Sequence, residues 1–188
     1  LDNMADARHL GPTHGAPCEY FENEWQGHIY IQRQGGFHKG YGSMLRSRTW
    51  YTGPGVLLSR QVFGDIKTIE LIANTPVDEG AVQVWHGALY RATGPEVTAA
   101  DRAAAREVQA GALQAFSSDF EIWKNKRPAT RILGVPEDGR FGKGRAWYKQ
   151  FYAPRQAAGE MHRRLDGVIH LNDLTPPPPE HVQFEQTF

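Results

Sequence analysis

Residues 56–73 read VLLSRQVFGDIKTIELIA. Two runs of β-favouring residues, Val56 to Phe63 and Ile66 to Ala73, flank Gly64-Asp65, a dipeptide typical of a tight turn between paired strands. Within each run, neighbouring side chains point to opposite faces of a strand. The stretch therefore predicts an antiparallel β-hairpin.

Further strands are predicted on both sides of this hairpin. Residues 24–34 and 46–52 precede it, and they are separated by Gly35-Gly36 and a glycine-rich segment, 37–45, that we expect to be a loop. Residues 81–92 follow it, after a connecting turn at 74–80. Such a succession of strands predicts an antiparallel meander.

A long helix is predicted directly after the last strand. Thr98 is a good N-cap residue, and Asp101 three positions later resembles a capping box. Alanine, arginine, glutamate and glutamine carry the helix to about Lys126, and Pro128 ends it. An antiparallel sheet followed by one long helix packed on it indicates an α+β fold.

The C-terminal third is predicted to contain shorter elements. Residues 145–152 favour a short helix, and residues 159–173 favour a short helix and a strand. Residues 175–188 open with a polyproline segment, which favours a spacer over a ligand for a proline-binding partner. We therefore expect one domain at 1–174 and a proline-rich tail at 175–188.

Composition excludes several classes of function. The 188-residue chain has 21 basic and 21 acidic residues, so no strong field exists to attract nucleic acid. No apolar run reaches the length of a membrane span and no signal peptide is visible, so we expect a cytoplasmic protein. Cys18 is the single cysteine, so an internal disulfide is excluded. We expect its side chain to serve as a small apolar group in the packing of the domain.

The first residues have the spacing of metal ligands. Asn3, Asp6 and His9 recur every three residues, so they share one face of a helix expected at residues 1–10. Gly11-Pro12 then breaks the helix, which lets His14 turn back toward His9. Two neutral imidazoles and one distant carboxylate form the facial triad of non-haem Fe(II) oxygenases. The plain alternative is a polar helix end with two unrelated surface histidines.

The long helix offers a carboxylate in an unusual place. Phe116, Phe120 and Trp123 recur at helical spacing and form an apolar face. Asp119 lies beside this face, where a carboxylate must be paired, protonated or bound to metal. Glu121 is the rival ligand, and it points about 200° away on the helix.

Three blocks resemble one family. Asn3-x2-Asp6-x2-His9-x4-His14 is similar to the mononuclear iron motif of the Rieske oxygenase catalytic domain. Residues 118–126 (SDFEIWKNK) and 145–152 (RAWYKQFY) resemble the oxygenase component of 3-ketosteroid 9α-hydroxylases. The resemblance implies a helix-grip, START-like fold, with iron and substrate between the sheet and the long helix.

The resemblance also implies residue roles. His9, His14 and Asp119 would ligate Fe(II), with Asp119 favoured over Glu121. Asp6 would bridge an iron-ligand histidine to a histidine of a neighbouring Rieske cluster, and Asn3 would lie near the iron. An apolar substrate, steroid-like or polycyclic, would contact Phe116, Phe120, Trp123 and Trp85.

The implied reaction is hydroxylation with O2, and it needs components from outside the chain. A Rieske [2Fe–2S] cluster requires two cysteines and two histidines, so the single cysteine cannot support one here. We expect the cluster to come from a missing N-terminal Rieske domain or another chain. A ferredoxin or flavin reductase and a homotrimeric assembly are also implied.

Two other functions remain open at this stage. A metal-independent helix-grip module would bind a hydrophobic ligand without iron. A zinc hydrolase would use two histidines and a carboxylate, although no H-E-x-x-H signature supports it.

His38 is a further candidate for a nitrogen ligand of the metal. A solvated loop histidine is the favoured interpretation of this residue.

Overall fold

The computed structural model describes residues 4–6, 18–127, 129, 131–134, 139–170 and 174–186. Its strands are β1 (Tyr20–Gln26), β2 (Ile29–His38), β3 (Ser43–Gly53), β4 (Val56–Phe63), β5 (Ile66–Asp78), β6 (Ala81–Tyr90) and β7 (Gly167–His170). Its helices are α2 (Ala99–Asn125), α3 (Phe141–Lys149), the short 3-10 helix η2 (Gln150–Tyr152), α4 (Arg155–Leu165) and α5 (Pro179–Gln186).

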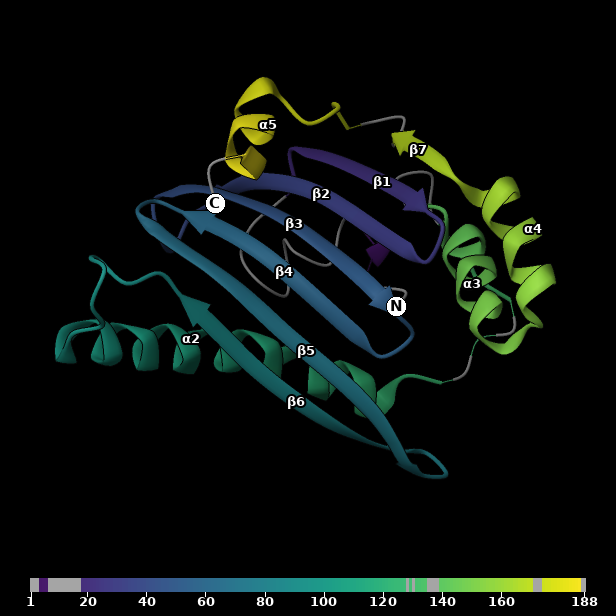
Figure 1. The fold of residues 1–188 in the computed structure, drawn as a ribbon, viewed down its shortest axis with the longest axis horizontal. Helices are drawn as coiled ribbons and strands as arrows, with labels where there is room; N and C mark the ends of the chain where they lie inside the picture. The colour runs from purple at the N-terminus through teal and green to yellow at the C-terminus, as the bar shows by residue number, and fades with distance from the viewer. Residues whose placement is uncertain are drawn as a thin grey trace.

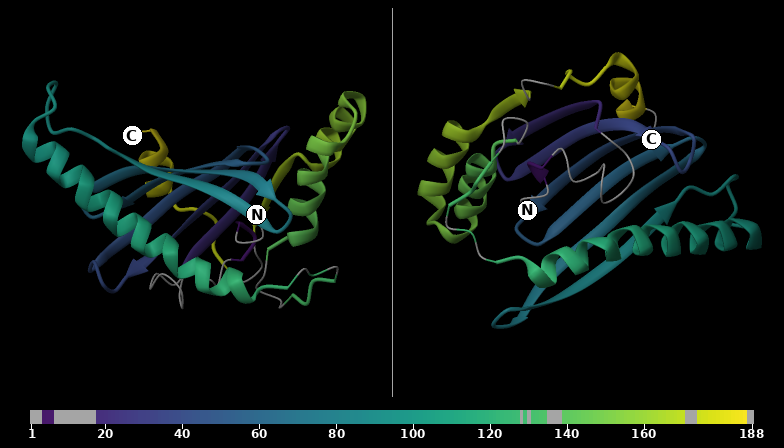
Figure 2. Two further views of the ribbon diagram at one scale, coloured as in Figure 1. Left: turned by 90° about the horizontal axis from the view of Figure 1, so that it is seen from below. Right: turned by 180° about the vertical axis from the view of Figure 1, so that it is seen from behind.

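The described strands form one antiparallel sheet in the order β6-β5-β4-β3-β2-β1-β7. The long helix α2 crosses one face of the sheet near β5 and β6, whereas α5 lies on the opposite face (Figures 1 and 2). Helices α3 and α4 lie together at one end of the strands (Figure 1). The predicted α+β fold, with an antiparallel sheet and a long helix packed on it, is confirmed.

The predicted hairpin and helix are both present at the expected residues. β4 and β5 pair from Phe63↔Ile66 to Val56↔Ala73 around Gly64, whose φ of 57° fits the turn. The Thr98 side chain accepts a hydrogen bond from the Asp101 amide, and the Asp101 carboxylate accepts one from the Thr98 amide. The Asp101 carboxylate also accepts hydrogen bonds from the Thr98 hydroxyl and from the amide and hydroxyl of Thr93. The hydrogen bonds to this carboxylate, that from the Thr98 hydroxyl foremost, hold the pKa of Asp101 well below its usual range.

The expected single strand at 24–34 is wrong, because a tight turn divides it. β1 ends at Gln26 and β2 begins at Ile29. Gly27 adopts φ 57° between them, and its amide donates to Asp166 Oδ1 at 2.7 Å. Glycine reaches this left-handed region without strain, so the two strands can pair antiparallel.

The expected break at Gly35-Gly36 is also wrong, since both glycines lie inside β2. The ring of Tyr20 occupies the place where a side chain on Gly35 would lie. The loop expected at 37–45 is correspondingly shorter, because β2 extends to His38 and β3 starts at Ser43. The connecting turn expected at 74–80 shrinks in the same way, since β5 runs to Asp78.

The main apolar core joins α3 and α4 to the sheet. Trp147 of α3 is fully buried and packs against Tyr30 and Tyr51, with ring centroids 5.6 and 6.1 Å away. Trp25 stacks on Tyr30 at 4.8 Å. The helix α3, followed by η2, confirms the short helix expected at 145–152. Likewise, α4 and β7 confirm the helix and strand expected in 159–173.

The C-terminal segment differs from the expected spacer. Thr175 forms a parallel bridge with Tyr20, and α5 then packs on the outer face of the sheet. His181 and Phe184 of α5 are buried, and His181 Nδ1 lies 2.7 Å from the Tyr20 hydroxyl. Within the described residues, no helix has the length and apolarity needed to cross a membrane.

Candidate functional site: a cavity between the sheet and the long helix

A cavity of about 820 Å³ lies between the inner face of the sheet and α2. This volume lies within the range of small-molecule sites. Its floor comes from β2 to β5 and its wall from α2 between Ala104 and Lys126. The antiparallel register arranges the floor in four rows of side chains that run across the strands.

The four rows differ in polarity. The first row is mainly apolar and consists of Tyr30, Tyr51, Leu57, Ile72 and His86. The central row consists of Gln32, Thr49, Ser59 and Glu70. The third row consists of Gln34, Ser47, Gln61 and Thr68. The fourth row is apolar and consists of Leu45, Phe63 and Ile66. The cavity floor thus has an apolar end near α3, two polar rows in the middle and an apolar row at the far end.

Asp119 projects from α2 into this cavity and is 7% exposed. It lies on the helix face that covers the sheet, as the spacing of the apolar residues predicts. Glu121 is different, because its side chain is 73% exposed and bonded to Lys124. Of the two candidate carboxylates, Asp119 is the one that lines the cavity.

The predicted aromatic residues separate into two groups. Phe116 and Trp123 line the cavity, and Phe120 packs edge-on to Phe116 with ring centroids 4.9 Å apart. Trp85 does not line it, because β6 alternates and places this side chain on the other face, 67% exposed. Its neighbour His86 faces inward instead and stacks on Phe116 at 5.4 Å.

The N-terminal motif is described only in part. Asp6 lines a second cavity of about 670 Å³, and this cavity shares Trp123 and Lys126 with the first. Asn3, His9 and His14 lie outside the described residues, as does most of the helix expected at 1–10. In the part of the chain that the structure describes, no three His, Cys, Asp or Glu side chains are grouped as a metal site.

The Met4 carbonyl fixes the start of the chain against the inner face. It accepts hydrogen bonds from Asn23 Nδ2 and Gln32 Nε2, both at 3.0 Å. Met4 itself is buried and lines the same cavity as Asp119. Two residues later, Asp6 lines the second cavity, which shares Trp123 and Lys126 with the first.

Glu70 is the titratable side chain of the polar floor. Burial raises its pKa to about 7, although a hydrogen bond from Gln61 Nε2 at 2.7 Å partly offsets the increase. His86 Nε2 lies 3.9 Å from Glu70 Oε1, and burial lowers the pKa of His86. Gln109 of α2 approaches His86 Nδ1 at 2.9 Å, which joins the helix to this group.

Sequence reasoning did not single out these polar floor residues. The runs 56–63 and 66–73 carry polar and apolar residues on both faces, so their alternation does not reveal the inward face. His38, expected in a solvated loop, ends β2 and lines the far end of the cavity, where its Nδ1 accepts from the Tyr41 amide.

Residues 1–152 match the family model described as the 3-ketosteroid 9α-hydroxylase C-terminal domain. The chain belongs to this family. The match covers the N-terminal motif, the sheet through β6, α2 and α3, so both walls of the cavity fall within it.

Curated relatives from Rhodococcus rhodochrous and Mycobacterium tuberculosis share one name. The oxygenase component of a 3-ketosteroid-9-alpha-monooxygenase from Rhodococcus rhodochrous is 31% identical over 81% of this chain and 43% of its own length. Another from that organism is 29% identical over 90% of this chain and 47% of its own length. One from Mycobacterium tuberculosis is 30% identical over 81% of this chain and 43% of its own length. The chain spans about half the length of the curated relatives it matches.

Proposed function

We propose that this chain is the catalytic domain of a Rieske-type oxygenase that hydroxylates an apolar, steroid-like substrate with O2. The observation that carries the proposal is Asp119, a buried carboxylate on α2 that lines a substrate-sized cavity. Membership of the 3-ketosteroid 9α-hydroxylase C-terminal family supports the same reaction class.

The donor set fits a mononuclear Fe(II) site. Asp119 presents a carboxylate to the cavity, and a carboxylate oxygen is a ligand that Fe(II) accepts beside two imidazole nitrogens. His9 and His14 would supply the two nitrogens and Asp119 the oxygen, which is the 2-His-1-carboxylate set of non-haem iron oxygenases. Bound iron would supply the activation of O2.

The residues of this chain would bind and orient the substrate. Phe116 and Trp123 form an apolar wall beside Asp119, so a flat apolar molecule would lie between them and the sheet. Closing the cavity over such a molecule removes water from the reacting carbon and strengthens polar contacts inside. Asn3 would lie near the metal, and Asp6 would orient an iron-ligand histidine.

Electrons would come from outside the chain. A [2Fe–2S] Rieske cluster would be provided by a Rieske domain, reduced in turn by a ferredoxin or flavin reductase. We further propose a cytoplasmic homotrimer in which Asp6 faces the cluster of a neighbouring subunit. The location of Asp6 at a separate cavity beside Trp123 supports a role at the edge of the site.

Iron content tests the proposal directly. After anaerobic Fe(II) loading, we expect about one iron per chain in the wild type and almost none in Asp119→Asn, His9→Ala or His14→Ala. Glu121→Gln is the matched control, because it changes an exposed carboxylate two residues away, and it should retain the metal.

Two results would contradict the metal assignment. Full iron content in Asp119→Asn would exclude Asp119 as a ligand. A wild-type protein that holds no iron but still binds lipophilic ligands would favour the metal-independent binding module.

The zinc hydrolase is tested separately, because such an enzyme would act without O2 or reductant.

A further inference from the structure

Two adjacent residues on the cavity floor each bury a polar atom that has no hydrogen-bond partner. Among the described residues, Gln34 Oε1 and Ser47 Oγ have no such partner. Gln34 is 6% exposed and Ser47 is 3% exposed, and both line the cavity. Such atoms are rare in folded proteins, and they indicate a group that the protein itself does not supply.

Their polar neighbours on the same floor are satisfied. Thr49 Oγ1 and Ser59 Oγ bond at 2.8 Å, and Gln61 Nε2 donates to Ser59 and Glu70. Thr68 Oγ1 donates to the Leu89 carbonyl at 3.0 Å. In the rows of Gln32 and Gln34, the described residues thus leave two side-chain atoms without a hydrogen-bond partner, Gln34 Oε1 and Ser47 Oγ. A further such atom, His86 Nε2, lies in the first row, 3.9 Å from Glu70 Oε1.

Gln34 and Ser47 are direct partners across β2 and β3. Side chains opposite one another in an antiparallel pair have Cβ atoms about 5 Å apart, so one ligand atom can contact both. Gln34 Oε1 is an acceptor, whereas the Ser47 hydroxyl can donate or accept. A ligand hydroxyl complements both, because it donates to Gln34 and accepts from Ser47.

The pair also has a defined position along the cavity. It lies in the third row, two rows beyond the row of His86, which stacks on Phe116 beside Asp119. Four residues of extended strand span about 13 Å. A group held at Gln34 and Ser47 would therefore fix the far end of an elongated molecule whose other end lies near Phe116.

We propose that Gln34 and Ser47 form a subsite that recognises a hydroxyl group on an otherwise lipophilic ligand. The lipophilic body of that ligand rests on the function proposed above. The subsite determines which oxygenated molecules bind and in which direction they enter the cavity.

Ligand binding to iron-free protein tests this subsite separately from the oxygenase reaction. The probes are 5α-androstane and its 3β-alcohol and 17β-alcohol, followed by quenching of tryptophan fluorescence, because Trp123 lines the cavity. We expect the wild type to bind at least one alcohol about tenfold more tightly than the hydrocarbon.

Ser47→Ala and Gln34→Leu should each remove most of this preference and leave hydrocarbon binding within about twofold. Ile66→Val is the control, since it trims the same cavity without changing a polar group, and it should keep the preference. Thermal unfolding checks that each variant is folded.

The outcomes separate this proposal from the proposed function. Equal binding of alcohols and hydrocarbon, a preference that survives both substitutions, or no binding of any probe would overturn the subsite. A wild type that prefers an alcohol but holds no iron would overturn the oxygenase function and leave the subsite standing.

Discussion

Glu70 shows how burial in the cavity makes a single residue sensitive to pH. Its carboxylate has one hydrogen-bond donor, Gln61, and lies under α2, so the pKa rises from its ordinary value of 4.5 to about 7. Between these values the folded protein retains a proton that the unfolded chain releases. The free energy of unfolding therefore falls as the pH rises through this window.

We expect this loss to be about 3 kcal/mol between pH 4.5 and 7. Urea unfolding at pH 5 and pH 8 measures it, and Glu70→Gln should remove that part of the pH dependence. Glu121→Gln, on an exposed side chain, should behave as the wild type does. An identical pH dependence in Glu70→Gln and the wild type would show that Glu70 titrates normally.

The candidate site could be predicted only where one residue carries a local signal. The helical spacing of Phe116, Phe120 and Trp123 puts Asp119 on the covered face, and the structure buries it there. Glu70 and Ser47 carry no such signal, because a strand with polar residues on both faces does not reveal which face is inward. Trp85 illustrates the same limit, since it lies one residue from the inward His86.

At the level of elements, the sequence predicts best where a local interaction sets the boundary. The capping box between Thr98 and Asp101 fixes the start of α2, and these two residues alone predict that start from the sequence. Glycine in a strand depends on distant contacts instead. Gly35 remains in β2 because the Tyr20 ring packs over it, and that contact cannot be read from neighbouring residues.

Gly35→Ala should therefore destabilise the protein although alanine favours a strand no less than glycine. The added methyl group would overlap the Tyr20 ring, and such overpacking costs about 1–3 kcal/mol. Gly111→Ala is the matched control, since a side chain there meets no neighbouring atom and alanine favours the helix. Denaturant midpoints should move in opposite directions. A Gly35→Ala midpoint equal to the wild type would mean that the Tyr20 ring moves aside freely.

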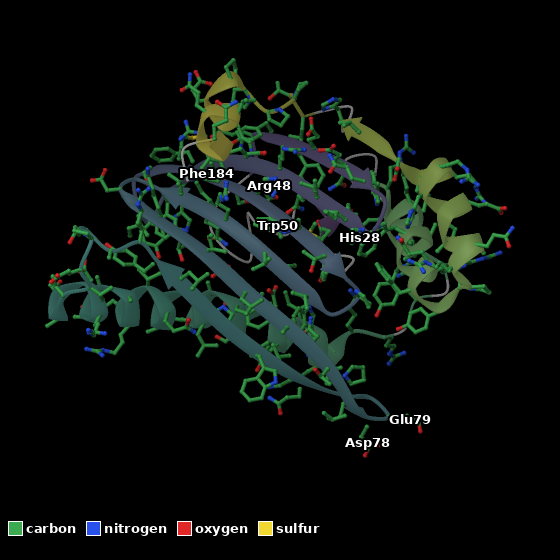
Figure 3. All side chains as sticks on the ribbon, viewed as in Figure 1. His28, Arg48, Trp50, Asp78, Glu79 and Phe184 are labelled. Atoms are coloured by element: carbon green, nitrogen blue, oxygen red, sulfur yellow. The ribbon has the colours of Figure 1, made fainter. Side chains whose placement is uncertain are left out.

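For the whole molecule, the segment beyond the family match completes the fold. β7 pairs with β1, and α5, which carries Phe184, lies on the outer face of the sheet (Figure 3). Glu185 of α5 binds Arg33 Nε at 2.6 Å and lies 3.3 Å from Arg48 Nε. A proline-rich sequence gives little indication of this packing, because the partners are more than a hundred residues away.

A chain that ends at residue 174, where a domain boundary was expected, should therefore be less stable than the full chain. Removing α5 exposes the surface that Phe184 and His181 cover, and it leaves Arg33 and Arg48 without the Glu185 carboxylate. Loss of one buried aromatic side chain alone costs about 3–5 kcal/mol, so the unfolding free energy should fall by at least about 3 kcal/mol. Phe184→Ala in the full chain should reproduce a large part of the loss, whereas Val182→Ala, on an exposed side chain, should have little effect. Equal urea midpoints for the 174-residue and 188-residue chains would instead make α5 a dispensable tail, and the catalytic domain would then end where the sequence predicts.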